Sequence, residues 1–428
     1  MKHLMFALLG AAGILLSPAL SRSQGATAVP FLLVPPSPEG LGIGGGTAAI
    51  PTTDAIAPLV NPGQLGLFSL TNLFNASTYI PTSDWLPQYG LSGMSYGVTA
   101  LNAGYNVRPL LSLPFDLSVG LGYSRVSLDL GTISFTTSAG PAVIGQFQSK
   151  ESSESYSVGI GLDYCVRLGF GFNFKRVVSE IGEIGTQPET GVSTGKSSAT
   201  DFGLLLVVPI DRIVVGVSGT SLEIAPRIKP FLDVSLGLVE ANVGEAMSYG
   251  NGALADPLPR TSAIGLSAGI GLVMRLRETE WQLASVRLVH QAEDLLVSRH
   301  GDGTFDYKSG LGDIQFWDDV VLGKSNVLVT SRRGWQVQVG EFFSWRAGSA
   351  ETPGDIRYTT YGYSICLGGI LKFIDWVNHY PDTDRSWIGF LMAHIDLQFH
   401  YATYDQSTSG AGSPTAQSLN LVVKGFSF

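Results

Sequence analysis

Charged residues are scarce in this sequence. Asp, Glu, Lys and Arg together make up 14% of its 428 residues, whereas an ordinary soluble domain carries about 25%. The formal net charge is −9, so the basic surface that nucleic-acid binding requires is not expected. The composition therefore argues against a nucleic-acid partner and against a typical water-exposed surface.

Cysteine is also scarce, since only Cys165 and Cys366 are present. A single pair cannot form the disulfide framework of a chain this long. Whether the two cysteines are bridged is left open by the sequence. The residue patterns give no positive evidence for catalysis, and we therefore do not predict an enzyme.

Long apolar runs are missing beyond the N-terminus. Residues 1–23 have a charged start, an apolar run over 4–16 and a stretch of small residues that ends at Ser23, as secretory signal peptides do. The remaining 405 residues (428 − 23) contain no further run of the length that a membrane-spanning helix needs. We therefore predict export, with a signal peptide over 1–23 and no inner-membrane helical domain.

Glycine, in contrast, is abundant and lies in segments of alternating pattern. The chain has 53 glycines, and over 168–174 glycine or asparagine separates Leu168, Phe170, Phe172 and Phe174. This period of two indicates strands with one bulky apolar face and one small or polar face. The alternation alone suits a soluble β-sandwich as well as a membrane barrel.

Export and the scarcity of charge favour the membrane barrel. In lipid, only helices and closed barrels satisfy every backbone polar group, and a barrel turns its apolar face to lipid and its other face to the lumen. We predict an all-β fold, a transmembrane antiparallel β-barrel of about 14 strands over 90–428, in the outer membrane of a Gram-negative (diderm) bacterium. The stretches expected to form long external loops are 179–200, 244–261, 298–325, 347–357 and 404–417.

The segment 24–89 differs from the strands that follow it. Over 31–67 it is rich in glycine and proline, and proline lacks the donor that a strand ladder needs. Gly40, Gly42 and Gly44 permit close approach of backbones. The residues expected to form its turns and caps are Asp54, Asn61, Pro62 and Gly63. We predict that the segment 24–89 plugs the lumen of the barrel.

Two patterns that imitate cofactor sites are set aside. Gly40, Gly42 and Gly45 satisfy the dinucleotide fingerprint, but no strand precedes them and no βαβ pattern follows. Asp302 and Asp306 have the spacing of calcium-loop ligands, but the downstream glutamate is missing. We therefore predict no cofactor and no metal site.

The residues of the plug carry a resemblance to a known family. The glycine-rich run 40–49, Asp54 followed by alanine, and Asn61-Pro62-Gly63 occur in the order found in the N-terminal segment of FadL-type outer-membrane barrels. Within these barrels, the sequence resembles the PorV/PorQ family, although Gly63 stands where that family usually has alanine. The other segments that resemble this family are 334–348 and 358–365.

This resemblance implies two functions, and we predict the PorV-like one, with the FadL-like one as the alternative. A PorV-like protein would be a component of type IX protein secretion that binds exported proteins or the translocon. A FadL-like protein would be a channel for uptake of hydrophobic compounds across the outer membrane. Either implies contact with outer-membrane lipid and with the barrel-assembly machinery, and Phe426 and Phe428 resemble the C-terminal signal that this machinery recognises.

One polar row stands out near the C-terminus. His394, Asp396, Gln398 and His400 alternate with apolar residues, which places them on one face of a strand. We interpret them as a row lining a solvated lumen, the alternative being a functional proton or substrate contact. The two histidines would lie about 20 Å apart on a strand, too far to share a metal ion.

Overall fold

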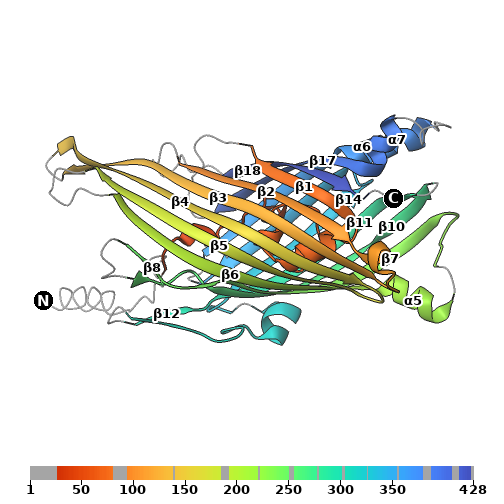
Figure 1. Ribbon diagram of the computed structural model, residues 1–428, viewed down its shortest axis with the longest axis horizontal. Coiled ribbons are helices and arrows are strands. Elements are labelled where there is room, and N and C mark those ends of the chain that lie inside the picture. Colours follow the sequence, from red (N-terminus) through yellow and green to blue (C-terminus); the bar gives the residue numbers. More distant parts are fainter. Residues whose placement is uncertain are drawn as a thin grey trace, which may run out of the picture.

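The structure is a computed structural model dominated by one large antiparallel sheet (Figure 1). The residues that it describes are 27–80, 94–137, 140–184, 192–219, 222–249, 255–276, 279–300, 304–324, 326–353, 356–378, 387–406 and 414–425. The predicted signal peptide over 1–23 and the predicted assembly signal, Phe426 and Phe428, lie outside these residues.

The sheet closes on itself. It has 16 strands, of which β8 (Met247–Ser248) and β9 (Ala255–Asp256) only extend it beside β6, so the ring has 16 − 2 = 14. The chain-terminal strands β1 and β18 pair with each other, and β5 pairs with β6. The predicted 14-stranded barrel is therefore confirmed. The strands of the ring are β1 (Asn72–Tyr79), β2 (Ser95–Asn106), β3 (Asp116–Thr137), β4 (Gly140–Asp163), β5 (Arg167–Ile184), β6 (Val192–Pro209), β7 (Ile228–Gly244), β10 (Thr261–Leu276), β11 (Thr279–Leu295), β14 (Thr330–Val339), β15 (Phe343–Thr352), β16 (Ile356–Cys366), β17 (Ile395–Gln406) and β18 (Thr415–Lys424).

The barrel begins earlier in the chain than the sequence indicates. The prediction assigned 24–89 to the plug, but β1 (Asn72–Tyr79) is a wall strand paired with β2 and β18. This strand is eight residues long and carries few bulky apolar side chains, so its alternation is weak. The wall therefore starts at Asn72, and we use the name plug below for residues 28–70.

The outer face of the wall is apolar. Large apolar side chains remain exposed on strand after strand, at positions that alternate with inward-facing glycine and polar residues. The most exposed on the strands include Leu121 (61%), Ile270 (59%), Leu288 (58%), Phe170 (51%) and Trp345 (51%). We call this exterior the apolar belt. Because a closed ladder leaves no backbone group unpaired and the belt matches lipid, the protein is an outer-membrane barrel, as predicted.

The two ends of the barrel differ. At the end where β1 begins and β18 ends, three of the six connections between ring strands are two or three residues long, against two of seven at the other end, 138–139 and 353–355. Short turns are typical of the periplasmic side, so we assign this end to the periplasm. At the other end, the strands β3 to β6 are 18 to 24 residues long and extend beyond their neighbours (Figure 1).

Several predicted loops are instead strands. The prediction placed a loop over 179–200, but β5 and β6 run through most of it and pair Ser179 with Gly195. The hairpin of β15 and β16 likewise occupies most of 347–357. Outside lipid a strand needs no apolar face, so these paired extensions carry no alternating signal. Short elements also lie within 298–325, namely β13 (Phe305–Tyr307) and a π-helix, η5 (Phe316–Val321), while β12 (Val297–Arg299) overlaps its start.

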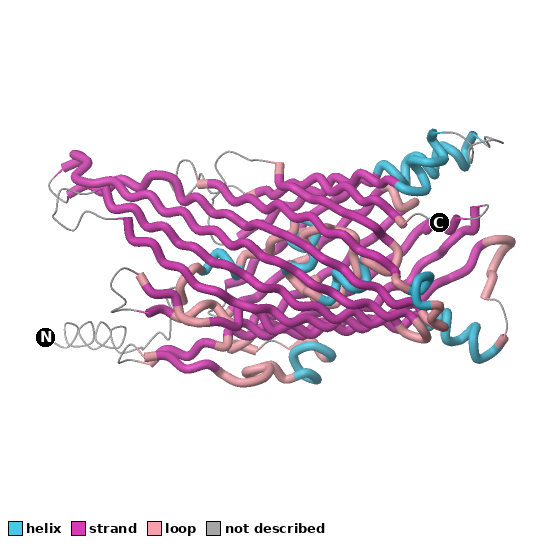
Figure 2. Tube along the Cα trace, in the orientation of Figure 1, coloured by secondary structure: helices cyan, strands magenta, loops and turns pink. Residues whose placement is uncertain are grey.

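Apart from η5, the helices lie inside the barrel and at its periplasmic end (Figure 2). Within the described residues no helix has the length and apolar character needed to cross a membrane. The helices of the plug are η2 (Pro30–Leu33), α2 (Pro38–Leu41), η3 (Ala57–Leu59) and α3 (Gly63–Phe68). Those of the periplasmic end are α4 (Arg108–Leu111), α5 (Ile210–Ser218), α6 (Leu367–Asn378) and α7 (Trp387–His394).

Candidate functional site

The plug fills the lumen and is buried there. Its apolar side chains Phe31, Ile43, Ile56 and Leu65 are each at most 2% exposed. Phe31 and Ile56 belong to a core cluster that they share with residues of the wall strands β2, β3, β5 and β6. The short helices of the plug lie within the ring of strands in Figures 1 and 2. This position shelters these apolar side chains from water, which is favourable.

The plug backbone rests directly on glycines of the wall. A methyl group added at Gly171 would overlap the carbonyl oxygen of Pro62, and one added at Gly237 would overlap that of Ala48. The same holds on seven wall strands, at Gly159, Gly161, Gly169, Gly171, Gly203, Gly237, Gly334, Gly348 and Gly362. The small inward face predicted from the alternation is therefore the seat of the plug, because only glycine leaves room for a second backbone.

A single substitution tests this seat. Gly171→Val should crowd the plug at Pro62, and overpacking of this kind costs about 1–3 kcal/mol. Hydrogen exchange of peptide amides over 57–68 should then be roughly 5- to 150-fold faster than in the unmodified protein. The matched control is Gly97→Val, because a methyl at Gly97 meets only the Ser127 hydroxyl, at 3.5 Å. Equal exchange in the two variants would contradict the seat.

The predicted turn residues lock this contact. The Asn61 side chain donates from Nδ2 to the carbonyl oxygens of Ala48 (2.7 Å) and Leu204 (3.0 Å). Its Oδ1 accepts from the backbone N–H of Gly63 (2.9 Å). Asn61 is fully buried and thus joins two parts of the plug to strand β6. Pro62 lies against Gly203 and Gly171, which neighbour it on the wall.

Gly42 and Gly44 also hold the plug against the wall, whereas Gly40 and Asp54 make contacts within the plug. Gly44 has a φ of +86° and faces the backbone of Ser349, where a side chain would be strained and would clash. Gly42 approaches the backbone of Gly362, while Gly40 packs on Thr47 within the plug. The Asp54 carboxylate accepts hydrogen bonds from the Ser37 hydroxyl and from the backbone N–H of Ile56. These residues position the plug.

A buried ion pair joins the plug to the wall. Arg346, which is 3% exposed, donates from Nη2 to Glu39 Oε1 of the plug at 2.8 Å. The same guanidinium donates to Ser364 Oγ (2.5 Å) and Gln336 Oε1 (3.0 Å). Ser364 Oγ lies 2.6 Å from Nδ1 of His400. The sequence analysis singled out neither Arg346 nor Glu39.

Two of the four residues in the predicted polar row, Gln398 and His400, face the plug, whereas Asp396 accepts a hydrogen bond from the backbone N–H of Gly368 in α6 (2.8 Å). Gln398 donates to Thr53 Oγ1 (3.3 Å) and to Asp396 (2.8 Å), and His400 is 2% exposed. Gln398 and His400 therefore pack on the plug rather than lining a solvated lumen. His394 was misplaced, because it ends the apolar helix α7 and the strand begins one residue later.

The two cysteines and one further motif carry no site. Cys165 and Cys366 are both free thiols. The sequence 265–269 matches the nucleophile motif G-x-S-x-G, but Ser267 lies in the middle of β10 and accepts a hydrogen bond from Arg287 (3.0 Å). A nucleophile elbow needs a strand-to-helix turn, which this strand lacks. No group of three metal-binding side chains gathers within the part of the chain that the structure describes.

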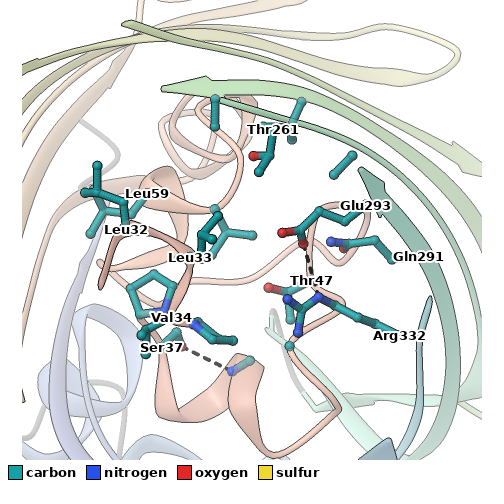
Figure 3. A pocket seen from close by; sticks show the side chains of 18 of the residues that line it. Leu32, Leu33, Val34, Ser37, Thr47, Leu59, Thr261, Gln291, Glu293 and Arg332 are labelled. Atoms are coloured by element: carbon teal, nitrogen blue, oxygen red, sulfur yellow. Dashed lines mark hydrogen bonds and ion pairs between the residues drawn. The ribbon is translucent and has the colours of Figure 1, made fainter. Parts of the chain in front are cut away.

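A cavity remains between the plug and the wall (Figure 3). Its volume is about 80 Å³. The plug contributes mainly apolar side chains, including Leu32, Leu33 and Leu59, and the wall contributes polar side chains together with a few small apolar ones. The polar lining residues from the wall are Lys175, Asn242, Thr261, Gln291, Glu293 and Arg332. The cavity therefore has a mixed lining, in which most of the apolar surface comes from the plug and the charged groups come from the wall.

Both cations that line this cavity are already paired. Lys175 Nζ lies 2.8 Å from a carboxylate oxygen of Asp201 and 2.8 Å from Oδ1 of Asn242. Arg332 donates from Nε to Glu293 (3.1 Å), and from Nη1 to Tyr358 (3.0 Å). A buried charge pair leaves little attraction for a further ion. The cavity therefore suits an uncharged ligand better than an anion.

Comparison with known proteins returns distant structural similarities alone. No family model matches the chain, and no curated protein matches it. Solved structures that resemble it are the Pseudomonas putida toluene transporter TodX (12% identity, TM-score 0.38, covering 90% of this chain and 96% of that one) and the CymD monoaromatic hydrocarbon channel (10%, 0.42, 91% and 97%). A Pseudomonas aeruginosa FadL homologue has 12% identity and a TM-score of 0.35, and covers 90% of this chain and 96% of its own. These neighbours are FadL-type barrels, and none of them points to the PorV/PorQ family.

Proposed function

We propose that the protein is an outer-membrane channel for uncharged hydrophobic compounds, gated by its plug. The observation that carries the proposal is the cavity between plug and wall, which is lined by apolar side chains such as Leu32, Leu33 and Leu59 and whose cations are neutralised. An apolar molecule would gain contacts there without displacing an ion pair, whereas an anion would find no free cationic partner among the lining residues.

In this proposal, the structure is the closed state of the channel. A dry engineered cavity of about 150 Å³ holds a benzene molecule, and typical ligand sites measure about 300–1,000 Å³. The cavity here is about 80 Å³, so even a single aromatic ring requires the plug to shift. The plug consists of short helices and is held to the wall by hydrogen bonds and by the ion pair of Arg346 with Glu39. These contacts can separate without breaking the strand ladder.

The other predicted function, a PorV-like role in type IX secretion, is not carried forward. That resemblance rested on residues that position the plug, among them Gly42, Gly44, Asp54 and Asn61. A seated plug is expected in any barrel of this type, so these residues do not favour a secretion partner over a small molecule. We also propose a transport role rather than a catalytic one.

Uptake of two matched probes tests the channel. N-phenyl-1-naphthylamine is uncharged, and 8-anilinonaphthalene-1-sulfonate is a similar aromatic amine that carries a negative charge. In diderm cells that lack their own hydrophobic-compound channels, expression of the protein should speed entry of the uncharged probe several-fold and leave entry of the sulfonate unchanged. Cells that express an unrelated barrel at the same level provide the control. No increase for the uncharged probe, or an equal increase for both, would contradict the proposal.

A further inference from the structure

The two helices that connect β16 to β17 expose an apolar surface at the periplasmic end. They are α6 (Leu367–Asn378) and α7 (Trp387–His394). Figure 1 shows both outside the outline of the barrel at that end. Their exposed large apolar side chains are Leu367 (43%), Phe373 (39%), Ile374 (44%), Trp376 (44%), Val377 (51%), Trp387 (73%) and Phe390 (49%).

This surface is held in a fixed position on the rim of the barrel. The rings of Phe373 and Trp376 lie 6.3 and 5.8 Å from that of Trp281, which is 3% exposed. Lys372 Nζ lies 2.7 Å from Glu341 in the turn between β14 and β15. The exposed apolar side chains therefore belong to helices that are packed against the rim of the barrel.

The surface continues the apolar belt. The belt reaches the periplasmic ends of the strands beside the helices, where Val339 closes β14 and Phe343 opens β15, with 45% and 39% exposed. Ile365 on β16 is 42% exposed, and α6 begins two residues after it. Lipid that contacts the belt at this edge therefore meets α6 next.

We infer that α6 and α7 form an anchor that inserts its apolar face into the periplasmic leaflet of the outer membrane. Helices with a large apolar face lie in the interface plane of a bilayer, and tryptophan is enriched there because its ring is amphipathic. The occupant is phospholipid rather than a protein, because the surface is an extension of one that already contacts lipid. The inference is independent of what the channel carries.

Spin labels measure the depth of the anchor. Val377→Cys and Trp387→Cys are each labelled with a nitroxide in the full chain, with Cys165 and Cys366 replaced by serine, and reconstituted in phosphatidylethanolamine and phosphatidylglycerol vesicles. Both labels should be accessible to oxygen and protected from a water-soluble nickel chelate. The lipid standard is a label at Leu121 on the belt, and the water standard is a label at Asp306, whose side chain is 80% exposed.

A measurement without labels guards against local disturbance. The contribution of Trp387 to the fluorescence is the difference between the unmodified protein and the Trp387→Phe variant. In vesicles of brominated lipid this contribution should be strongly quenched, since bromine quenches only nearby tryptophan. Nickel accessibility equal to that of the Asp306 standard at both positions, or an unquenched Trp387 difference, would overturn the anchor and leave the surface for a periplasmic protein.

Discussion

Deletion of 31–67 is expected to convert the closed barrel into an open, water-filled pore. The wall should still assemble, because its strand ladder is complete without the plug. Two inward charge pairs stay intact as well, and Arg346 keeps neutral hydrogen-bond partners. Arg332 with Glu293 and Lys175 with Asp201 join one wall strand to another, and Arg346 keeps its bonds to Ser364 and Gln336 when Glu39 is lost.

Conductance across a planar bilayer measures this expectation. The deletion variant should give stepwise, long-lived conductance that the full chain lacks, and vesicles that contain it should swell in small sugars. Retention of heat-modifiable migration in SDS would show that the barrel is folded. A folded deletion variant that stays impermeable would contradict the role of the plug, since some other part of the chain would then have to fill the lumen.

The wall of this barrel could largely be predicted from the sequence. Alternation such as that over 168–174 marks strands directly, because every second side chain meets lipid. The extensions of β5 and β6 beyond the belt could not be predicted, since paired strands in water carry no apolar face. The strand β1 was missed because it is short and its outward residues include small and polar ones.

For the wall residues that contact the plug, only the residue type could be predicted from the sequence. Glycines on the inward face were expected, but which of them meets the plug depends on strand register, which the pattern does not contain. The ion pair of Arg346 and Glu39 spans 307 positions, so nothing local links the two. One signal was available: in a chain with 14% charge, an arginine at an inward strand position such as Arg346 requires a buried partner.

If the plug gates the channel, tying it to the wall should abolish uptake. Gly46 of the plug and Gln291 of β11 provide the position for a disulfide, because a Cβ at Gly46 would lie 3.4 Å from that of Gln291. Disulfides span Cβ separations of about 3.5–4.5 Å, so a small backbone adjustment suffices. The double variant Gly46→Cys, Gln291→Cys is made with Cys165 and Cys366 replaced by serine.

After oxidation, cells that express this double variant should take up the uncharged naphthylamine probe no faster than cells without the protein. Reduction by dithiothreitol should restore uptake. Each single-cysteine variant should be insensitive to the oxidant, which separates locking from the loss of the hydrogen bond between Gln291 and the backbone N–H of Ala48. The lock falls at the cavity itself, since Gln291 is one of its lining residues. Full uptake by the oxidised protein would mean that compounds pass without movement of this part of the plug, and gating would then have to be assigned to a different segment.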